Sequence, residues 1–141
     1  MRLHNKIALI TGAANGIGFA TAKRFAEEGA KVMVADMNAN AVQEAVSKLK
    51  HAEPYVMNVA DRASVQSAVD EIIAKHHRID ILINNAGIIQ PFVKINKLDQ
   101  KAIDKVMAVN FTAPLALIKA FLPSLLAKNF GHIVNTSSMG S

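Results

Sequence analysis

The stretch from Ile7 to Gly29 constrains the fold most, because an apolar run, a cluster of glycines and an amphipathic pattern follow one another there. The apolar run is too short for a helix and breaks at Gly12, and apolar residues return at helical spacing after Gly18. This order predicts a strand, a glycine turn and a helix. The first turn of a helix offers unpaired N–H groups and the positive end of the dipole, so the stretch predicts an anion site, with phosphate as its natural ligand.

The spacing of the glycines narrows the class of site. Thr11 is followed by Gly12, Gly16 and Gly18 in the pattern G-x3-G-x-G. This differs from the general dinucleotide fingerprint G-x-G-x-x-G, and it lacks the lysine of the phosphate loop of kinases and ATPases. The plainer alternative is that the glycines only permit a tight turn and close packing of the helix.

The segment 11–18, TGAANGIG, resembles the cofactor-binding segment of the short-chain dehydrogenases/reductases, and further matches extend through nearly the whole chain. The resemblance implies a Rossmann-like fold and a nicotinamide cofactor, with hydride transfer between the nicotinamide and a secondary alcohol or ketone. The residues of this segment expected at the cofactor are Gly12, Asn15, Gly16, Ile17 and Gly18.

Composition limits the remaining possibilities. A chain of 141 residues with 51% hydrophobic residues predicts one domain, 1–141, and the absence of cysteine excludes disulfides and thiolate metal sites. No run of about 18 apolar residues appears, and the first six residues lead directly into the first strand, so we expect a cytoplasmic protein without a membrane partner. The net charge of +5 is spread over dispersed lysines, so nucleic acid is not an expected partner.

Strand and helix patterns alternate along the chain. The expected helices cover residues 16–28, 38–49, a segment that Asp61 caps and that ends near 76–78, and a long tract 99–128 interrupted by Pro114 and Pro123. The expected strands cover residues 6–11, 31–36, 54–57, 79–83 and 131–137. This alternation predicts an α/β fold with a doubly wound parallel sheet of five strands, truncated relative to the family that the chain resembles.

Polar residues follow each expected strand, at the edge where doubly wound sheets bind ligands. Asp36 comes eighteen residues after Gly18 and can accept the two hydroxyls of an adenosine ribose, with Met37 beside it. A 2′-phosphate would meet a like charge there, so NAD is expected rather than NADP, and the resemblance agrees. Alternatively, Asp36 caps the next turn.

Two further segments match the family. Asn58 and Val59 stand where the family usually carries an aspartate that holds the adenine amino group, and an asparagine carbonyl can still accept that contact. Asn58 can equally be a turn residue. The segment 84–87, Asn-Asn-Ala-Gly, is a signature of the family; we expect its amides to tie neighbouring strands together, and Asn85, Ala86 and Gly87 to lie at the cofactor.

Two residues are candidates for the chemistry. In the family, the asparagine that matches Asn110 bends its helix and holds a water of a proton relay, although Asn110 can also be only a kink residue near Pro114. Ser138 matches the serine that donates a hydrogen bond to the reacting oxygen, a role for which Ser137 is a competitor.

No metal is expected. His76 and His77 are adjacent and so lie about 100° apart on a helix, and the other three histidines lie in separate elements with no carboxylate at ligand spacing. All five are expected to be solvated or helix-ending.

One departure from the family limits the expected activity. The resemblance requires a Tyr-x3-Lys pair about a dozen residues beyond Ser138, whereas the only tyrosine here is Tyr55. We therefore expect the 141-residue chain alone to be catalytically incompetent toward its small-molecule substrate, with strand five left as an open edge. A homo-oligomer is expected, through the helix 99–128 or strand five. The alternatives are a non-catalytic nucleotide-binding or assembly module, and a methyltransferase, which segment 84–87 and the glycine spacing disfavour.

Overall fold

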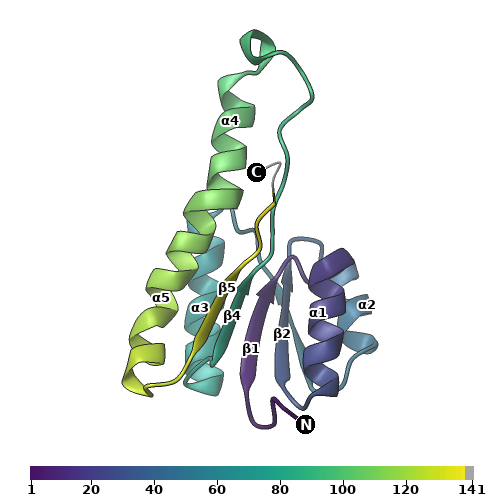
Figure 1. Ribbon diagram of the computed structural model, residues 1–141, viewed down its shortest axis with the longest axis vertical. Coiled ribbons are helices and arrows are strands. Elements are labelled where there is room, and N and C mark those ends of the chain that lie inside the picture. The colour runs from purple at the N-terminus through teal and green to yellow at the C-terminus, as the bar shows by residue number, and fades with distance from the viewer. Residues whose placement is uncertain (139–141) are drawn as a thin grey trace.

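The computed structural model describes residues 1–138, and within them one parallel sheet carries the fold (Figure 1). The strands lie in the order β3-β2-β1-β4-β5. Their bounds are β1 (Ile7–Thr11), β2 (Lys31–Asp36), β3 (Ala52–Val56), β4 (Ile81–Asn84) and β5 (His132–Asn135). The chain moves outward from β1 to β3 and then crosses back to β4, so the strand order reverses between β1 and β4. The doubly wound α/β fold predicted from the sequence is confirmed.

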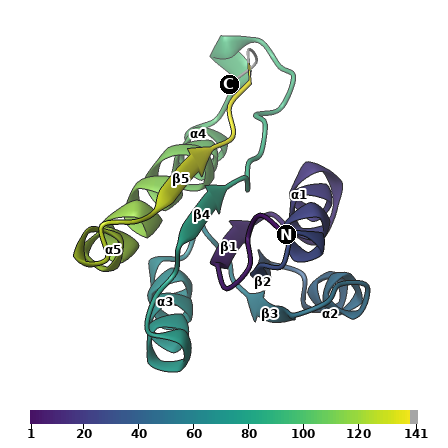
Figure 2. The same cartoon turned by 60° about the horizontal axis from the view of Figure 1, so that its bottom comes forward.

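Helices cover both faces of the sheet (Figure 2). The helices α1 (Gly16–Glu27) and α2 (Ala39–Ser47) pack on one face, and α3 (Arg62–His76) and α5 (Ala113–Ala127) pack on the other. Alternate residues of β1 therefore enter different cores: Ala8 and Ile10 face α1 and α2, while Leu9 faces α3 and α5. This two-sided burial explains why the central strands are apolar without interruption.

The bounds of several strands differ from the sequence prediction. β3 covers Ala52–Val56 instead of 54–57, and β5 ends at Asn135 instead of continuing to Ser137. The pairing of β5 stops there because its partner β4 ends at Asn84, which is in register with Asn135. β4 likewise begins at Ile81, so residues 79 and 80 precede the strand.

The long helical tract is irregular at its middle. After the short turn η1 (Ile95–Lys97), α4 (Gln100–Met107) continues through a π-helical segment, η2 (Ala108–Thr112), into α5. Pro114 lies in the first turn of α5 and Pro123 lies inside it. The whole stretch Gln100–Ala127 is long and apolar enough to cross a membrane by length and composition alone, a property that core helices of soluble proteins share.

Candidate functional site at the carboxyl edge of the sheet

The carboxyl ends of the strands gather most of the polar residues singled out in the sequence. Thr11, Asp36, Asn84 and Asn135 are the last residues of β1, β2, β4 and β5. Because all strands are parallel, these residues share the edge that faces upward in Figure 1. The strand order reverses at this edge between β1 and β4, which is where open α/β sheets bind ligands.

Two of the three glycines in the first loop are required by packing. A Cβ on Gly18 would lie 2.2 Å from the carbonyl oxygen of Gly12, and a Cβ on Gly12 would lie 2.9 Å from the Cα of Ala86. Both distances are shorter than real contacts allow, so the plainer packing explanation accounts for these two positions. Gly16 differs, because its φ of +59° favours glycine while no heavy atom lies within 4 Å of the position a Cβ would occupy.

The first turn of α1 has open hydrogen-bond donors. Asn15 precedes it in an extended conformation and its side chain makes no capping hydrogen bond. The first intrahelical bond runs from the Phe19 N–H to the Asn15 carbonyl. The side chains of Asn38, Asp61 and Asp99 instead cap α2, α3 and α4, as predicted for Asp61. Among these four helices only α1 presents its first N–H groups without a side-chain acceptor.

Asp36 points toward the loop that precedes α1. Its Oδ2 accepts a hydrogen bond from the Ala14 N–H at 3.1 Å, and its Oδ1 accepts one from the Met37 N–H at 2.8 Å. The helix that follows is capped by Asn38, so Asp36 is not its cap. The Asp36 carboxylate is half-buried beside the glycine loop, and Met37 next to it is exposed.

The segment after β4 joins three strands. The Asn84 amide donates to the Asn135 Oδ1 at 3.0 Å and so connects β4 with β5. The backbone N–H groups of Asn85 and Ala86 both donate to the Thr11 hydroxyl at 3.0 Å, and the Asn85 amide donates to the Gly12 carbonyl at 3.3 Å. The predicted tie between neighbouring strands is therefore present. These bonds also hold Ala86 against the glycine loop.

Asn110 lies in the π-helical segment and holds the loop that follows β4. Its Oδ1 accepts from the Ile88 N–H at 2.9 Å, and its Nδ2 donates to the Ile88 carbonyl at 2.7 Å. Gly87, which precedes Ile88, is exposed, and a Cβ there would lie 3.5 Å from the Asn110 Oδ1. The predicted helix irregularity at Asn110 is thus observed, and its side chain positions the loop.

The remaining candidates follow β3 and β5. Asn58 forms a turn, because its Oδ1 accepts from the Ala60 N–H at 3.0 Å, while Val59 packs against the core on the α3 side. Ser137 and Ser138 are exposed and follow β5. The preceding Thr136 keeps this segment near β4 through a bond from its N–H to the Asn84 carbonyl at 2.9 Å.

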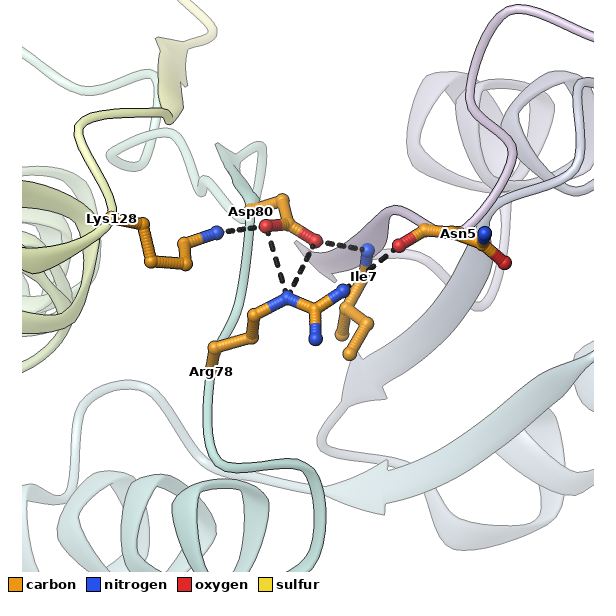
Figure 3. Close-up of polar contacts among 5 residues, drawn as sticks. All are labelled: Asn5, Ile7, Arg78, Asp80 and Lys128. Atoms are coloured by element: carbon orange, nitrogen blue, oxygen red, sulfur yellow. Dashed lines mark hydrogen bonds and ion pairs between the residues drawn. The ribbon is translucent and has the colours of Figure 1, made fainter.

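A buried carboxylate at the opposite edge was not recognised in the sequence. Asp80 is 2% exposed and accepts hydrogen bonds from the Ile7 N–H at 2.8 Å, from the Arg78 Nε and from the Lys128 ammonium (Figure 3). Arg78 also donates to the Asn5 carbonyl at 2.9 Å. Burial alone would raise the pKa of Asp80, but Lys128, the Ile7 N–H and Arg78 together lower it.

A second carboxylate, Glu53 on β3, was also missed. It pairs with Lys75 at 2.9 Å, with His76 at 2.8 Å and with Lys31 at 3.3 Å. Burial opposes its ionisation, yet Lys75, His76 and Lys31 lower the pKa of Glu53 to about 2. His76 ends α3 as predicted but is not solvated, since its side chain is only 7% exposed. In the part of the chain that the structure describes, no group of His, Asp and Glu residues is arranged to hold a metal.

Tyr55, the only tyrosine of the chain, is buried in β3 and donates to the Glu53 carboxylate at 3.4 Å. Burial, together with the charges of Glu53 and Glu71, raises the pKa of Tyr55 to about 12. A buried phenol whose pKa is raised in this way is a weaker proton donor near neutral pH than an ordinary tyrosine.

Known proteins share both the sequence and this architecture. The oxidoreductase YxbG of Bacillus subtilis is 41% identical over 98% of this chain and 52% of its own length. A metagenomic short-chain oxidoreductase in complex with NADP superimposes with a TM-score of 0.92 at 30% identity, covering 99% of this chain and 65% of the other. An NAD⁺-bound xylitol dehydrogenase superimposes with a TM-score of 0.90 at 33% identity, covering 99% and 55%.

The chain spans about half the length of the curated relative that it matches. The family described as short chain dehydrogenase matches residues 6–141, which is nearly every residue of this sequence. Together with the parallel sheet and the Asn-Asn-Ala-Gly segment that joins its centre, this match establishes the lineage: the chain belongs to the short-chain dehydrogenase family.

Proposed function

We propose that this chain forms the dinucleotide-binding portion of a cytoplasmic, NAD-dependent oxidoreductase that moves hydride between a secondary alcohol or ketone and nicotinamide. In this proposal the N–H groups of Gly16, Ile17 and Gly18 hold the pyrophosphate and Asp36 accepts the ribose hydroxyls. When bound, the nicotinamide supplies the hydride acceptor or donor. The further cofactor contacts are assigned at the ends of the strands: Gly12, Asn15, Met37, Asn58, Val59, Asn85, Ala86 and Gly87.

One observation carries the proposal, namely that the uncapped first turn of α1 lies beside a carboxylate already turned toward it. Asp36 reaches the loop of α1 through the Ala14 N–H at 3.1 Å. Donors for a phosphate and an acceptor for a sugar therefore lie close together in space at one edge of the sheet. This combination fits the two polar parts of an adenosine diphosphate unit.

The preference for NAD rests on the charges near Asp36. A 2′-phosphate would face the Asp36 carboxylate, and the next residue, Met37, offers no positive charge. Lys23 and Arg24 are basic but lie more than a turn along α1, at roughly 10 Å of helix length from Gly16. Arg24 is also paired with Glu27 and Glu28. These cations therefore do not neutralise Asp36.

Cofactor preference is tested by titrating the protein with NADH and with NADPH. We expect the unchanged protein to bind NADH more tightly than NADPH. Asp36→Ala should weaken NADH binding and lower the ratio of the NADH affinity to the NADPH affinity by about tenfold, which corresponds to about 1.4 kcal/mol. Asp70→Asn, a change to an exposed carboxylate on α3, is the matched control and should leave both affinities unchanged. Equal affinities for the two cofactors before and after Asp36→Ala would refute the assignment.

We further propose that Ser138 and Asn110 belong to the reaction site of the whole enzyme, and that the 141-residue chain alone does not turn over. Tyr55 supports the second part, because the only phenol of this chain is buried with a pKa of about 12. The expected result is no NAD-dependent oxidation of any alcohol above background. Turnover by this chain that is lost in Ser138→Ala would contradict the proposal.

Self-association through the helical tract 99–128 or through β5 is part of the proposal. Phe111, Leu115 and Leu126 are 57%, 47% and 69% exposed along this tract, and β5 is an edge strand of the described sheet. Such apolar surface favours a contact with a second copy. Light scattering should therefore show an oligomer. An oligomer that binds no NADH would favour the alternative of a non-catalytic assembly module.

A further inference from the structure

A cavity of about 1050 Å³ lies at the amino edge of the sheet, opposite the glycine loop. Five segments form it: the residues before β1, the end of α1, the start of β2, the residues that follow α2, and the residue Arg78 between α3 and β4. The N-terminus and the starts of β1 and β2, whose residues line the cavity, lie at the lower end of the molecule in Figure 1. Its volume is that of a small-molecule site.

The walls of this cavity are strongly basic. Six cationic side chains line it, against the single carboxylate of Glu27: Lys6, Lys23, Lys31, Lys48, Lys50 and Arg78. The lysines are dispersed in the sequence, but the fold brings more than a third of the 16 lysines and arginines to one cavity. Dispersal along the sequence therefore coexists with a cluster of cations in space.

Several of these cations already have partners. Lys31 pairs with Glu53 at 3.3 Å, Lys48 pairs with Glu44 at 3.3 Å, and Arg78 pairs with Asp80. The Lys6 ammonium lies 3.8 Å from the centre of the Phe130 ring. Lys23 and Lys50, by contrast, have no carboxylate within ion-pair distance among residues 1–138. These two exposed ammonium groups are available to a ligand.

Helix dipoles explain only part of this charge. The carboxyl ends of α1 and α2 lie at this edge, and a cation near a helix C-terminus is favourable, which accounts for Lys48, the residue that caps the C-terminus of α2. Lys6 precedes β1, Lys31 begins β2, and Lys23 lies before the last turn of α1, so this effect does not account for these three cations. A concave surface lined by one sign of charge focuses its field on whatever enters it.

We propose that this cavity binds a compact anion carrying two or more phosphate groups, with Lys23 and Lys50 as its main contacts. A polyphosphate carries several anionic groups, so it can contact cations that come from more than one segment of the cavity wall. This site is separate from the proposed dinucleotide site, which lies at the other edge of the sheet.

The test uses inorganic tripolyphosphate as the probe, titrated calorimetrically into the protein with and without excess NADH. We expect binding of about one anion per chain that persists in NADH, because the two sites are separate. The double variant Lys23→Gln/Lys50→Gln should lower the affinity for tripolyphosphate by at least about tenfold and leave the affinity for NADH unchanged. The matched control is Lys101→Gln/Lys105→Gln on α4, which removes the same charge at two exposed positions.

Three results would overturn the proposal. The first is no binding of tripolyphosphate. The second is an equal loss in both double variants, which would mean that net charge alone attracts the anion. The third is displacement by NADH, which would place the anion on the glycine loop. Because NADH affinity is measured in the same variants, failure of this site is distinguishable from failure of the proposed dinucleotide site.

Discussion

The two edges of the sheet differ in how fully their polar groups are paired. At the amino edge, the carboxylates of Asp80 and Glu53 are each surrounded by several cations or donors and have lowered pKa values. At the carboxyl edge, among residues 1–138, Asp36 accepts two backbone N–H groups, and the first turn of α1 has no side-chain cap. Paired charges are thus concentrated at one edge, and open hydrogen-bonding capacity at the other.

This difference indicates that the two edges have different roles, one in the stability of the fold and the other in binding. A carboxylate whose partners come from distant segments stabilises the fold, because Asp80 alone connects β1, the approach to β4 and the end of α5. Open donors contribute little to stability, since water satisfies them in the free protein. They become useful when an anion replaces that water. Variants at the amino edge should therefore change stability, and variants at the carboxyl edge should change binding.

The largest effect is expected at Asp80. Asp80→Ala leaves Lys128 and Arg78 without their counterion and the Ile7 N–H without an acceptor, and we expect a loss of about 3 kcal/mol in the free energy of unfolding. Urea denaturation followed by circular dichroism measures this loss. Asp70→Ala on the exposed face of α3 is the control, expected within about 0.5 kcal/mol of the unchanged protein. A loss at Asp80 no larger than that of the control would break the comparison.

A smaller effect is expected from the charge of Glu53. Its pKa is lowered from 4.5 to about 2 in the fold, so its stabilisation is complete above pH 4.5 and is lost as the pH falls toward 2. At neutral pH we expect Glu53→Gln to cost about 2 kcal/mol, because Lys31 and Lys75 are partly solvent-screened.

The measurement is unfolding free energy as a function of pH for both proteins. The difference between them should be constant near neutrality and should narrow steadily below about pH 4.5. A difference that stays the same throughout the acid range would show that Glu53 acts through packing and not through its charge.

The smallest expected effect on stability comes from helix capping, which differs between α3 and α1. Asp61→Ala removes an acceptor of the Ala63 and Ser64 N–H groups and should cost about 1 kcal/mol. Asn15→Ala removes no capping bond, so we expect less than about 0.5 kcal/mol. Thermal melts of the two variants make the comparison. Equal losses would mean that Asn15 caps α1 in solution.

Local patterns in the sequence predicted most of the carboxyl edge. The glycine loop, the Asp61 cap, the order of strands and helices and the tie made by segment 84–87 each depend on neighbouring residues or on the rule that parallel strands end at one edge. The amino edge was not predicted. Asp80 and Lys128 are 48 residues apart, and Glu53 and His76 are 23 apart, and no local period connects such residues.

The same limit explains two further differences. The end of β5 is determined by the length of its partner β4 and not by its own residues. Asn110 was singled out because asparagine is unfavourable within a helix, but its partner Ile88 lies 22 residues earlier in a loop without a pattern. Sequence reasoning therefore located unusual residues more reliably than it located their contacts.

The central claim is that the first-turn N–H groups of α1 and the carboxylate of Asp36 hold a dinucleotide. The most direct test follows the backbone amide resonances of the isotopically labelled protein while NADH is added. We predict that the largest shifts occur at Gly16, Ile17 and Gly18, with further shifts at Ala14 and Met37. Saturation by NADH that leaves these five amides unmoved would contradict the account.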